Sequence, residues 1–463
     1  MTMLTRRSFL SATAATAATA SWRIWAAEEG LPAYYGDHLA DVARKVNRLK
    51  KTCCDGFWFL TDLHVPSNRC VSGRLLARLT AETGMKKVLC GGDHVEAFGG
   101  KDSIDRTIAD YQEKWVRAIE RAGGEFFPAK GNHDFTIRKS MAVKEGFTYS
   151  GTRARDILMD TDAVRKRAVT NPDDPEACYY YVDEPAARLR YIVADSSDRI
   201  ATDRTYWAVE YGIRDPQLTW LAEKALKGIP AGWTAVVMQH IPVAEIVSCE
   251  DKGLKAMVGW RRMLEAYQNR RKVTIDGKTF DFTKARGRIL CDITGHEHAE
   301  RQTCLDGLWH ITEPCDAAYR DYINGSSPWS PNLPVKERGT VFEQTFDAVQ
   351  IDRNRRMLHL TRVGGGGDRT IHLKRRSMKT GEMLGFKAVR LAGPVTWGIY
   401  DASRITRRPN PQNRYDHFYS YHSDVAGIAS DGTVTAKKPG ECIVVALNGV
   451  GNKELFPLTV KAS

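Results

Sequence analysis

The chain has 463 residues, 42% of them hydrophobic and 9% aromatic, and it carries a formal net charge of +12. This composition argues against an intrinsically disordered chain, and the length favours roughly two to three domains. The positive charge favours anionic ligands, but the basic runs are too short to indicate a nucleic-acid or membrane surface.

The N-terminus carries paired arginines within Thr5–Leu10, followed by the small-residue stretch Ser11–Ala20. This pattern resembles the twin-arginine export signal, which implies a signal peptide over residues 1–27 and a protein that is periplasmic or secreted. A disordered basic tail is the alternative. The small-residue stretch is too short to span a bilayer, and no other apolar run approaches membrane length, so we expect no transmembrane anchor after cleavage.

From about residue 50, short apolar runs without alternation predict strands that are covered on both faces. Helical patterns lie between several of them, within Gly73–Glu82, within Tyr111–Ala122 and from Asp215 onward. Strands that alternate with helices indicate a layered α/β domain, here over residues 50–374. The predicted strands are Phe57–Leu60, Val88–Cys90, Glu125–Phe127, Tyr191–Ala194, Ala235–Met238 and Ile289–Cys291.

Two charged segments, residues 136–188 and 244–285, are longer than ordinary connections and are expected to be insertions near the mouth of a site. Residues 345–373 predict a closing hairpin, which precedes four consecutive glycines. The hairpin strands are Phe346–Ile351 and Met357–Val363.

The C-terminal part, residues 380–463, is predicted to be a small all-β sandwich, because turn signals at Asp431-Gly432 and Pro439-Gly440 separate short β-like runs. Asp424–Ala446 resembles bacterial immunoglobulin-like domains of the invasin type. This resemblance implies a partner on a cell surface. The β-like runs are Val395–Trp397, Ser430–Ala436 and Cys442–Ala446.

The ten cysteines include no Cys-x-x-Cys pair, which argues against a structural zinc ribbon. Cys90 and Cys291 lie in apolar runs and are expected to be buried thiols. The pairing of the others in an oxidising compartment stays open. The candidates are Cys53, Cys54, Cys70, Cys178, Cys304 and Cys315.

Polar motifs stand at or just beyond the ends of five predicted strands. Because ligands bind beyond the carboxyl ends of strands in open α/β sheets, we expect these motifs to meet at one edge. Each motif alone is common as a turn or a solvated group, whereas all of them in this order indicate a built site. They are Asp62-Leu63-His64, Gly92-Asp93, Gly131-Asn132-His133-Asp134, His240 and Gly295-His296-Glu297-His298.

The residue types of these motifs fit a site for two metal ions. A carboxylate bridges two cations, and imidazole and amide oxygen suit Zn, Fe or Mn better than Ca or Mg. The motifs contain no cysteine, so a site made of thiolates alone is not implied. Glycines before Asp93, Asn132 and His296 allow tight turns where the chain leaves the sheet.

The series of motifs resembles the signature of calcineurin-like metallophosphoesterases over residues 55–370, with Leu189–Asp195 and Leu218–Leu221 similar to the cyclic-nucleotide phosphodiesterase-like branch. The resemblance implies a β-sandwich flanked by helices. It also implies hydrolysis of phosphate esters by a binuclear metal centre that activates a bridging water. Under this resemblance Asp62, His64 and His298 hold one metal, Asn132, His240 and His296 hold the other, and Asp93 bridges them.

The resemblance also implies roles beside the metals. His133 is expected near the leaving-group oxygen, as a proton donor. Glu96 stands where some members carry an acidic partner for that histidine, and Asp134 is expected to cap the following turn. His94 is interpreted either as a substrate contact or as a surface residue.

Three functions remain open from the sequence. The leading one is a metal-dependent phosphatase or phosphodiesterase that acts on a small phosphate ester or an envelope phosphodiester. The second is an exported binding protein on a disused scaffold, against which the intact motifs argue. The third is a nuclease, whose binding would weaken steeply with salt. Aromatic residues in Tyr206–Tyr211 and Tyr319–Trp329 are candidates for pocket lining or for packing.

Overall fold

The computed structural model describes residues 31–65, 71–96, 101–134, 151–198, 212–243, 252–316, 336–385, 417–448 and 451–463. The expected signal peptide, the run Val395–Trp397 and the aromatic segments Tyr206–Tyr211 and Tyr319–Trp329 lie outside the described residues. Within the described part, no helix combines the length and the apolar character that crossing a membrane requires.

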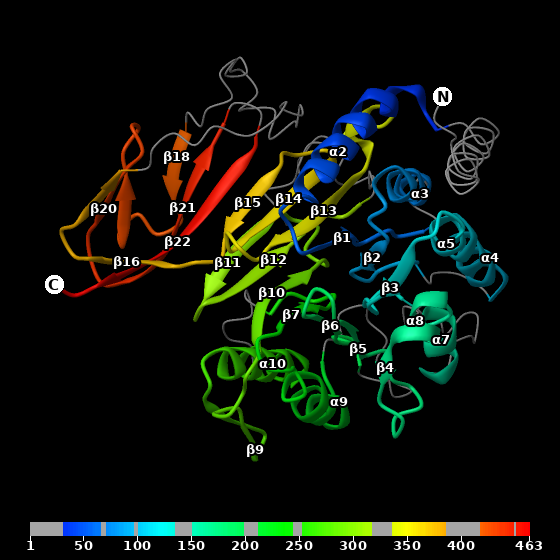
Figure 1. Cartoon of the computed structure of the whole chain (residues 1–463). Helices are drawn as coiled ribbons and strands as arrows, with labels where there is room; N and C mark the ends of the chain where they lie inside the picture. The colour runs from blue at the N-terminus through cyan, green and yellow to red at the C-terminus, as the bar shows by residue number, and fades with distance from the viewer. Residues whose placement is uncertain are drawn as a thin grey trace, which may run out of the picture.

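Two β-sheets pack face to face at the centre of the molecule (Figure 1). The first sheet contains β1 (Asp55–Leu60), β2 (Lys87–Cys90), β3 (Glu125–Pro128), β13 (Thr345–Asp352), β14 (Met357–Gly364), β15 (Arg369–His372), β16 (Arg376–Lys379), β18 (His417–Ser420), β21 (Gly440–Leu447) and β22 (Lys453–Lys461). Its order is β18-β21-β22-β15-β14-β13-β1-β2-β3, with β16 beside β22.

The second sheet contains β4 (Val169–Thr170), β5 (Tyr180–Glu184), β6 (Leu189–Val193), β7 (Thr234–Met238), β10 (Arg288–Thr294), β11 (Arg301–Leu305) and β12 (Leu308–Thr312), in the order β11-β12-β10-β7-β6-β5-β4. Strands β1, β2 and β3 run parallel in the first sheet, as do β6, β7, β10 and β12 in the second. The carboxyl ends of these parallel strands therefore lie at a common edge of each sheet, and the polar motifs begin there.

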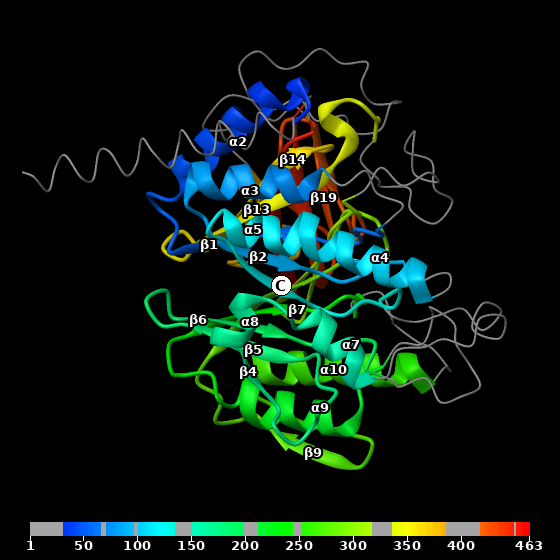
Figure 2. The same ribbon diagram turned by 90° about the vertical axis from the view of Figure 1, so that its right-hand side faces the viewer.

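Strand β1 shows why the predicted strands lack alternation. Phe57 and Phe59 are fully buried between the two sheets, whereas Trp58 and Leu60 face the helices on the other side. Successive side chains of a strand point to opposite faces, so a strand covered on both faces must be apolar throughout. The fold class expected from the sequence is confirmed: a β-sandwich with helices outside (Figure 2).

The helices form the two outer layers (Figure 2). The first sheet is covered by α2 (Gly36–Leu49), α3 (Ser72–Thr83), α4 (Lys101–Tyr111), the π-helical segment η2 (Gln112–Arg117) and α5 (Ala118–Arg121). The second sheet is covered by α9 (Asp215–Trp220), the π-helical segment η3 (Leu221–Leu226) and α10 (Lys252–Gln268). Helix α3 buries Leu75, Leu76 and Leu79 and ends at Gly84, whose φ of 64° closes the last turn.

The structure extends the set of elements predicted from the sequence. The helix predicted over Tyr111–Ala122 begins at Lys101, and α2 was not predicted at all. The two segments expected as insertions carry regular elements where they are described. These elements are α7 (Gly151–Leu158), α8 (Asp162–Arg167), β4 and β5 in the first segment, and α10, β8 (Lys272–Ile275) and β9 (Lys278–Asp281) in the second.

The C-terminal strands form a second, smaller sandwich. Strands β17 (Met383–Gly385), β20 (Thr433–Ala436) and β19 (Ala426–Ile428) make a separate sheet. Its Val434 packs with Cys442, Val444 and Leu458 of β21 and β22. The first sheet itself runs on into this sandwich, because β22 pairs in parallel with β15. The all-β region expected from the sequence is therefore hydrogen-bonded to the α/β part.

The described cysteines form no disulfide. Cys90 and Cys291 are buried, as predicted. Of the residues for which pairing was left open, Cys70 lies outside the described residues. The others are free thiols: Cys53, Cys54, Cys178, Cys304 and Cys315.

Helix α2 is held by a hydrogen bond that requires a neutral imidazole. The Gly364 N–H donates to Nε2 of His38 at 2.9 Å. Burial, assisted by the charge of Lys45, lowers the pKa of His38 to about 4. Because the unfolded chain takes up this proton near pH 6.5, the free energy of unfolding should fall as the pH decreases from about 6.5 to 4.

Urea denaturation at pH 7 and at pH 5 checks this expectation. His38→Gln keeps an acceptor that does not titrate, so the variant should lose less unfolding free energy than the wild type over this interval. An equal loss in both proteins would show that His38 does not sense pH in the fold.

Candidate metal centre

The polar motifs of the two sheets converge at the carboxyl ends of their strands. Asp62 and His64 follow β1, Asp93 follows β2, and Asn132 with His133 follows β3. His240 follows β7, and the loop Gly295–Glu300, which carries His296 and His298, joins β10 to β11.

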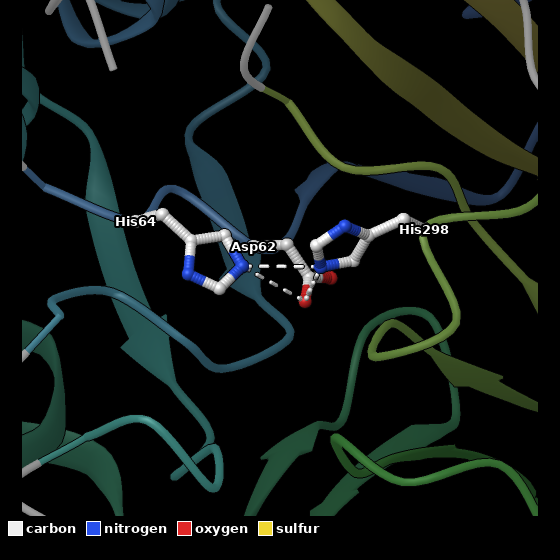
Figure 3. Close-up of side chains that lie close together, drawn as sticks. All are labelled: Asp62, His64 and His298. Carbon is white, nitrogen blue, oxygen red and sulfur yellow. Dashed lines mark hydrogen bonds and ion pairs between the residues drawn. The ribbon is translucent and has the colours of Figure 1, made fainter. Parts of the chain in front are cut away.

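A first group of donors is formed by Asp62, His64 and His298 (Figure 3). Nε2 of His298 lies 3.1 Å from Oδ1 of Asp62 and 3.1 Å from Nε2 of His64. Nε2 of His64 lies 3.7 Å from the same carboxylate oxygen. All three residues are buried. The two ring nitrogens and the carboxylate oxygen lie close enough together to share one cation.

A second group is formed around the amide oxygen of Asn132. This oxygen lies 2.9 Å from Nε2 of His240 and 2.9 Å from Nδ1 of His296. Nδ1 of His240 lies 2.8 Å from the Gly91 carbonyl, to which only a protonated Nδ1 can donate. This contact selects the tautomer that leaves Nε2 as an electron-pair donor toward the site.

The Asp93 carboxylate lies between the two groups. Its Oδ2 is 3.2 Å from Nε2 of His240 and 3.8 Å from Nε2 of His64. Its Oδ1 accepts a hydrogen bond of 2.7 Å from the His133 backbone N–H. Asp93 is therefore placed to contact ions in both groups.

His133 and Glu96 lie beside this centre. Nε2 of His133 is 4.0 Å from Oδ2 of Asp93, and 23% of the His133 side chain is exposed, so the ring can reach a ligand that enters from solvent. Oε1 of Glu96 lies 3.3 Å from Nδ1 of His64, a contact that the sequence analysis did not assign. The acid that was expected to orient His133 is thus placed to orient His64.

His94 and Asp134 connect two loops of the site. His94 is fully buried, so it is neither a surface residue nor a substrate contact. Its Nδ1 lies 2.8 Å from Oδ2 of Asp134. The Asp134 carboxylate also accepts from the backbone N–H groups of His94, Val95 and Gly131. Asp134 therefore ties the loop after β2 to the loop after β3.

The backbone at the site is strained. Ten non-glycine residues of the described chain have a positive φ, and half of them belong to the polar motifs. Such conformations cost roughly 1–3 kcal/mol each and persist where the surroundings enforce them, which is typical of functional sites. The motif residues are Asp62, His64, Asp93, His296 and His298.

The buried ionisable groups of the centre shift one another's pKa values. Burial alone would raise the pKa of Asp62, but the His298 and His240 rings outweigh it and hold this pKa well below its ordinary value. Burial would lower the pKa of His240, but Asp93 and Asp62 raise it to about 9. Burial, together with His240, lowers the pKa of His296 to about 3. Carboxylates and imidazoles are thus buried side by side, and bound metal cations in place of ring protons would balance the negative charge.

The calcineurin-like phosphoesterase family profile matches residues 56–300, which is more than half of the chain. The chain belongs to this family. It is a phosphoric ester hydrolase, and the family assignment made from the sequence is confirmed. No curated protein matches the chain.

Solved structures similar to this calcineurin-like phosphoesterase include a dimetal phosphatase from Danio rerio, at 14% identity and a TM-score of 0.44, over 70% of this chain and all of that chain. A phosphopantetheinyl hydrolase from Mycobacterium tuberculosis shows 14% identity and a TM-score of 0.29, over 58% and 91%. A 5'-nucleotidase precursor from Thermus thermophilus shows 12% identity and a TM-score of 0.30, over 64% and 51%. Likenesses of this size carry no argument about the substrate.

Two hydrogen bonds that the sequence pattern did not indicate position Asp62 of this phosphoesterase. Oγ1 of Thr61 donates to Oδ2 of Asp62 at 2.7 Å, and the His296 N–H donates to the same oxygen at 3.0 Å. These contacts leave Oδ1 directed at His298. Gly295 allows the close approach, because a Cβ at this position would overlap both Thr61 Oγ1 and the Asp62 carboxylate.

Gly295→Ala should therefore weaken metal binding. The added methyl group must displace Asp62, and a ligand held out of place typically costs about 10- to 100-fold in metal affinity. Calorimetric titration of metal-free protein with Mn²⁺ measures this loss. Gly36→Ala is the matched control, because a Cβ at Gly36 meets no atom within 4 Å. Equal affinities in the two variants would contradict the assignment of Asp62 as a ligand.

Proposed function

We propose that this calcineurin-like phosphoesterase hydrolyses phosphodiesters or phosphomonoesters at a centre of two metal ions, drawn from Mn, Fe and Zn. Asp62, His64 and His298 would hold one ion, Asn132, His240 and His296 the other, and Asp93 both. The observation that carries the proposal is the place of Asp93, whose Oδ2 lies within 4 Å of His64 on one side and of His240 on the other.

The donor set fits such ions. Imidazole nitrogens, carboxylates and one amide oxygen are the ligands that Mn, Fe and Zn accept, and the described site offers no thiolate. Two bound cations would supply Lewis-acid polarisation of a phosphoryl oxygen and would lower the pKa of an attacking water. The protein's own groups then have to orient the ester and assist departure of the leaving group.

His133 is the group best placed for the leaving group. Its backbone N–H is fixed by Asp93, and its partly exposed ring lies at the border between the donor groups and solvent. Burial lowers the pKa of His133. In either protonation state the ring retains an N–H for the leaving-group oxygen, and only the cationic form can transfer a proton outright.

The proposal also includes the charge of the substrate and the cellular location of the activity. The net charge of +12 draws anions toward the protein, which suits a small phosphate ester or an envelope phosphodiester. The paired Arg6 and Arg7 support export by the twin-arginine route, so we place the activity in the periplasm or outside the cell. A substrate outside the inner membrane would then be hydrolysed without being imported.

Hydrolysis of bis(p-nitrophenyl) phosphate and of p-nitrophenyl phosphate by Mn²⁺-loaded protein tests the proposal. Asp93→Ala should lower turnover of the preferred ester at least about 100-fold and reduce the metal content, because the shared ligand is lost. Asp173→Ala, at an exposed position, is the matched control and should behave as the wild type. Turnover that survives in Asp93→Ala would overturn the two-metal assignment.

His133→Asn separates metal binding from proton transfer. This variant should bind metal as the wild type does, yet turn over about 100-fold more slowly, which is the usual contribution of a general acid. The metal content is measured by mass spectrometry and the rate with the same two esters. A loss of metal in His133→Asn would identify His133 as a ligand, a role that its position beside His64 and Asp93 also permits.

A further inference from the structure

Six charged side chains lie buried together between the two sheets. None has more than 10% of its side chain exposed. Charges are costly to bury unless each finds a partner, so the groups that meet here fix the elements that carry them. The cluster consists of Glu300, Glu313, Asp347, Arg362, Arg369 and Lys453.

Glu300 connects this cluster to the metal centre. It follows His298 by two residues and closes the loop that begins at Gly295. Its Oε2 lies 2.7 Å from Nη2 of Arg362 and 3.2 Å from Nη1 of Arg369. Its Oε1 lies 3.1 Å from Nζ of Lys453. The carboxylate is therefore an anchor for a loop whose His296 and His298 both have a positive φ.

Lys453 comes from the C-terminal sandwich. It is the first residue of β22, and its N–H donates to the Asp368 carbonyl at 2.8 Å. The side chain of the preceding Asn452 accepts from the Asp368 N–H at 2.7 Å. In turn Asp368 Oδ1 accepts from the Arg362 N–H at 2.9 Å. The start of β22 is thus bonded both to Glu300 and to the strands that carry the arginines.

The cationic partners of Glu300 come from two different parts of the chain. The arginines belong to β14 and β15 of the phosphoesterase sheet, whereas the ammonium belongs to the added sandwich. The arginines share one carboxylate oxygen, and Lys453 holds the other. A carboxylate bound through one oxygen can rotate about its side chain, and a cation on each oxygen prevents this rotation.

We propose that Lys453 is a positioning residue of the metal centre. Through Glu300 it fixes the loop that presents His296 and His298, so the C-terminal sandwich is a working part of the phosphoesterase and not only a separate binding module. This inference rests on the proposed two-metal function, since it assigns a support to two of its ligands.

The test uses the full-length protein and measures Mn²⁺ affinity by calorimetric titration of the metal-free form. Lys453→Met should lower the affinity about tenfold, the lower end of what outer partners of metal ligands contribute. Lys453→Arg keeps a cation at this place and should recover most of the affinity. Lys461→Met removes an exposed lysine from the same strand and should leave the affinity unchanged.

A second control separates positioning from general loss of stability. Val444→Ala removes core volume from the C-terminal sandwich without touching the ion cluster. Thermal unfolding ranks all variants, and affinities are compared at a temperature where each is folded. A destabilised Val444→Ala should bind Mn²⁺ as the wild type does, whereas Lys453→Met should not.

The outcomes distinguish the two proposals. Wild-type affinity in folded Lys453→Met, or an equal loss in Val444→Ala, would overturn the positioning role while leaving the phosphoesterase function intact. A wild type that binds two metals but cleaves neither ester would overturn the proposed function and leave the affinity comparison valid. A wild type that binds no metal would overturn both.

Discussion

One buried carboxylate, that of Asp93, contacts groups that follow strands of both sheets. Asp93 follows β2 of the first sheet, takes a backbone hydrogen bond from His133 beyond β3, and faces His240 beyond β7 of the second sheet. An ionised group that is buried in this way needs several partners at once, because burial removes it from bulk solvent. The loops after β2, β3 and β7 consequently cannot move independently, and Asp134 reinforces this by binding the loops after β2 and β3 together.

Much of this arrangement is readable from the sequence, for physical reasons. Strands covered on both faces must be apolar throughout, as Phe57–Leu60 is, so their positions stand out. Parallel strands direct their carboxyl ends to one edge, so polar residues after several of them must converge. Helix α2 carries a signal as well, since Leu39, Val42 and Val46 follow helical spacing, but this segment precedes the recognisable motifs.

Other features depend on packing that no local pattern encodes. The contact between Glu96 and His64 is decided by how two loops lie against each other. The burial of His94 depends on the rings of Tyr111 and Phe126, which come from α4 and β3. The pairing of β22 with β15 joins segments about eighty residues apart, such as Thr370 with Glu454, and a strand's pattern does not specify its neighbour in the sheet. The sequence therefore predicts a β-sandwich at the C-terminal end, but it does not predict that a strand of this sandwich pairs with the first sheet.

The pairing of β22 with the first sheet has a consequence for the order of folding. The contact of Glu300 with Lys453 spans 153 residues, and the Gln350 side chain reaches the Val46 carbonyl across 304. Contacts of such separation close large loops, whose entropy must be lost before any favourable energy is recovered, so they form late in folding. Under the positioning role proposed for Lys453, the histidine loop would acquire its final shape only when β22 has joined the sheet. A chain that has assembled only its first strands lacks the donors that follow β7 and β10, so the proposed site would retain ions only after the second sheet has formed.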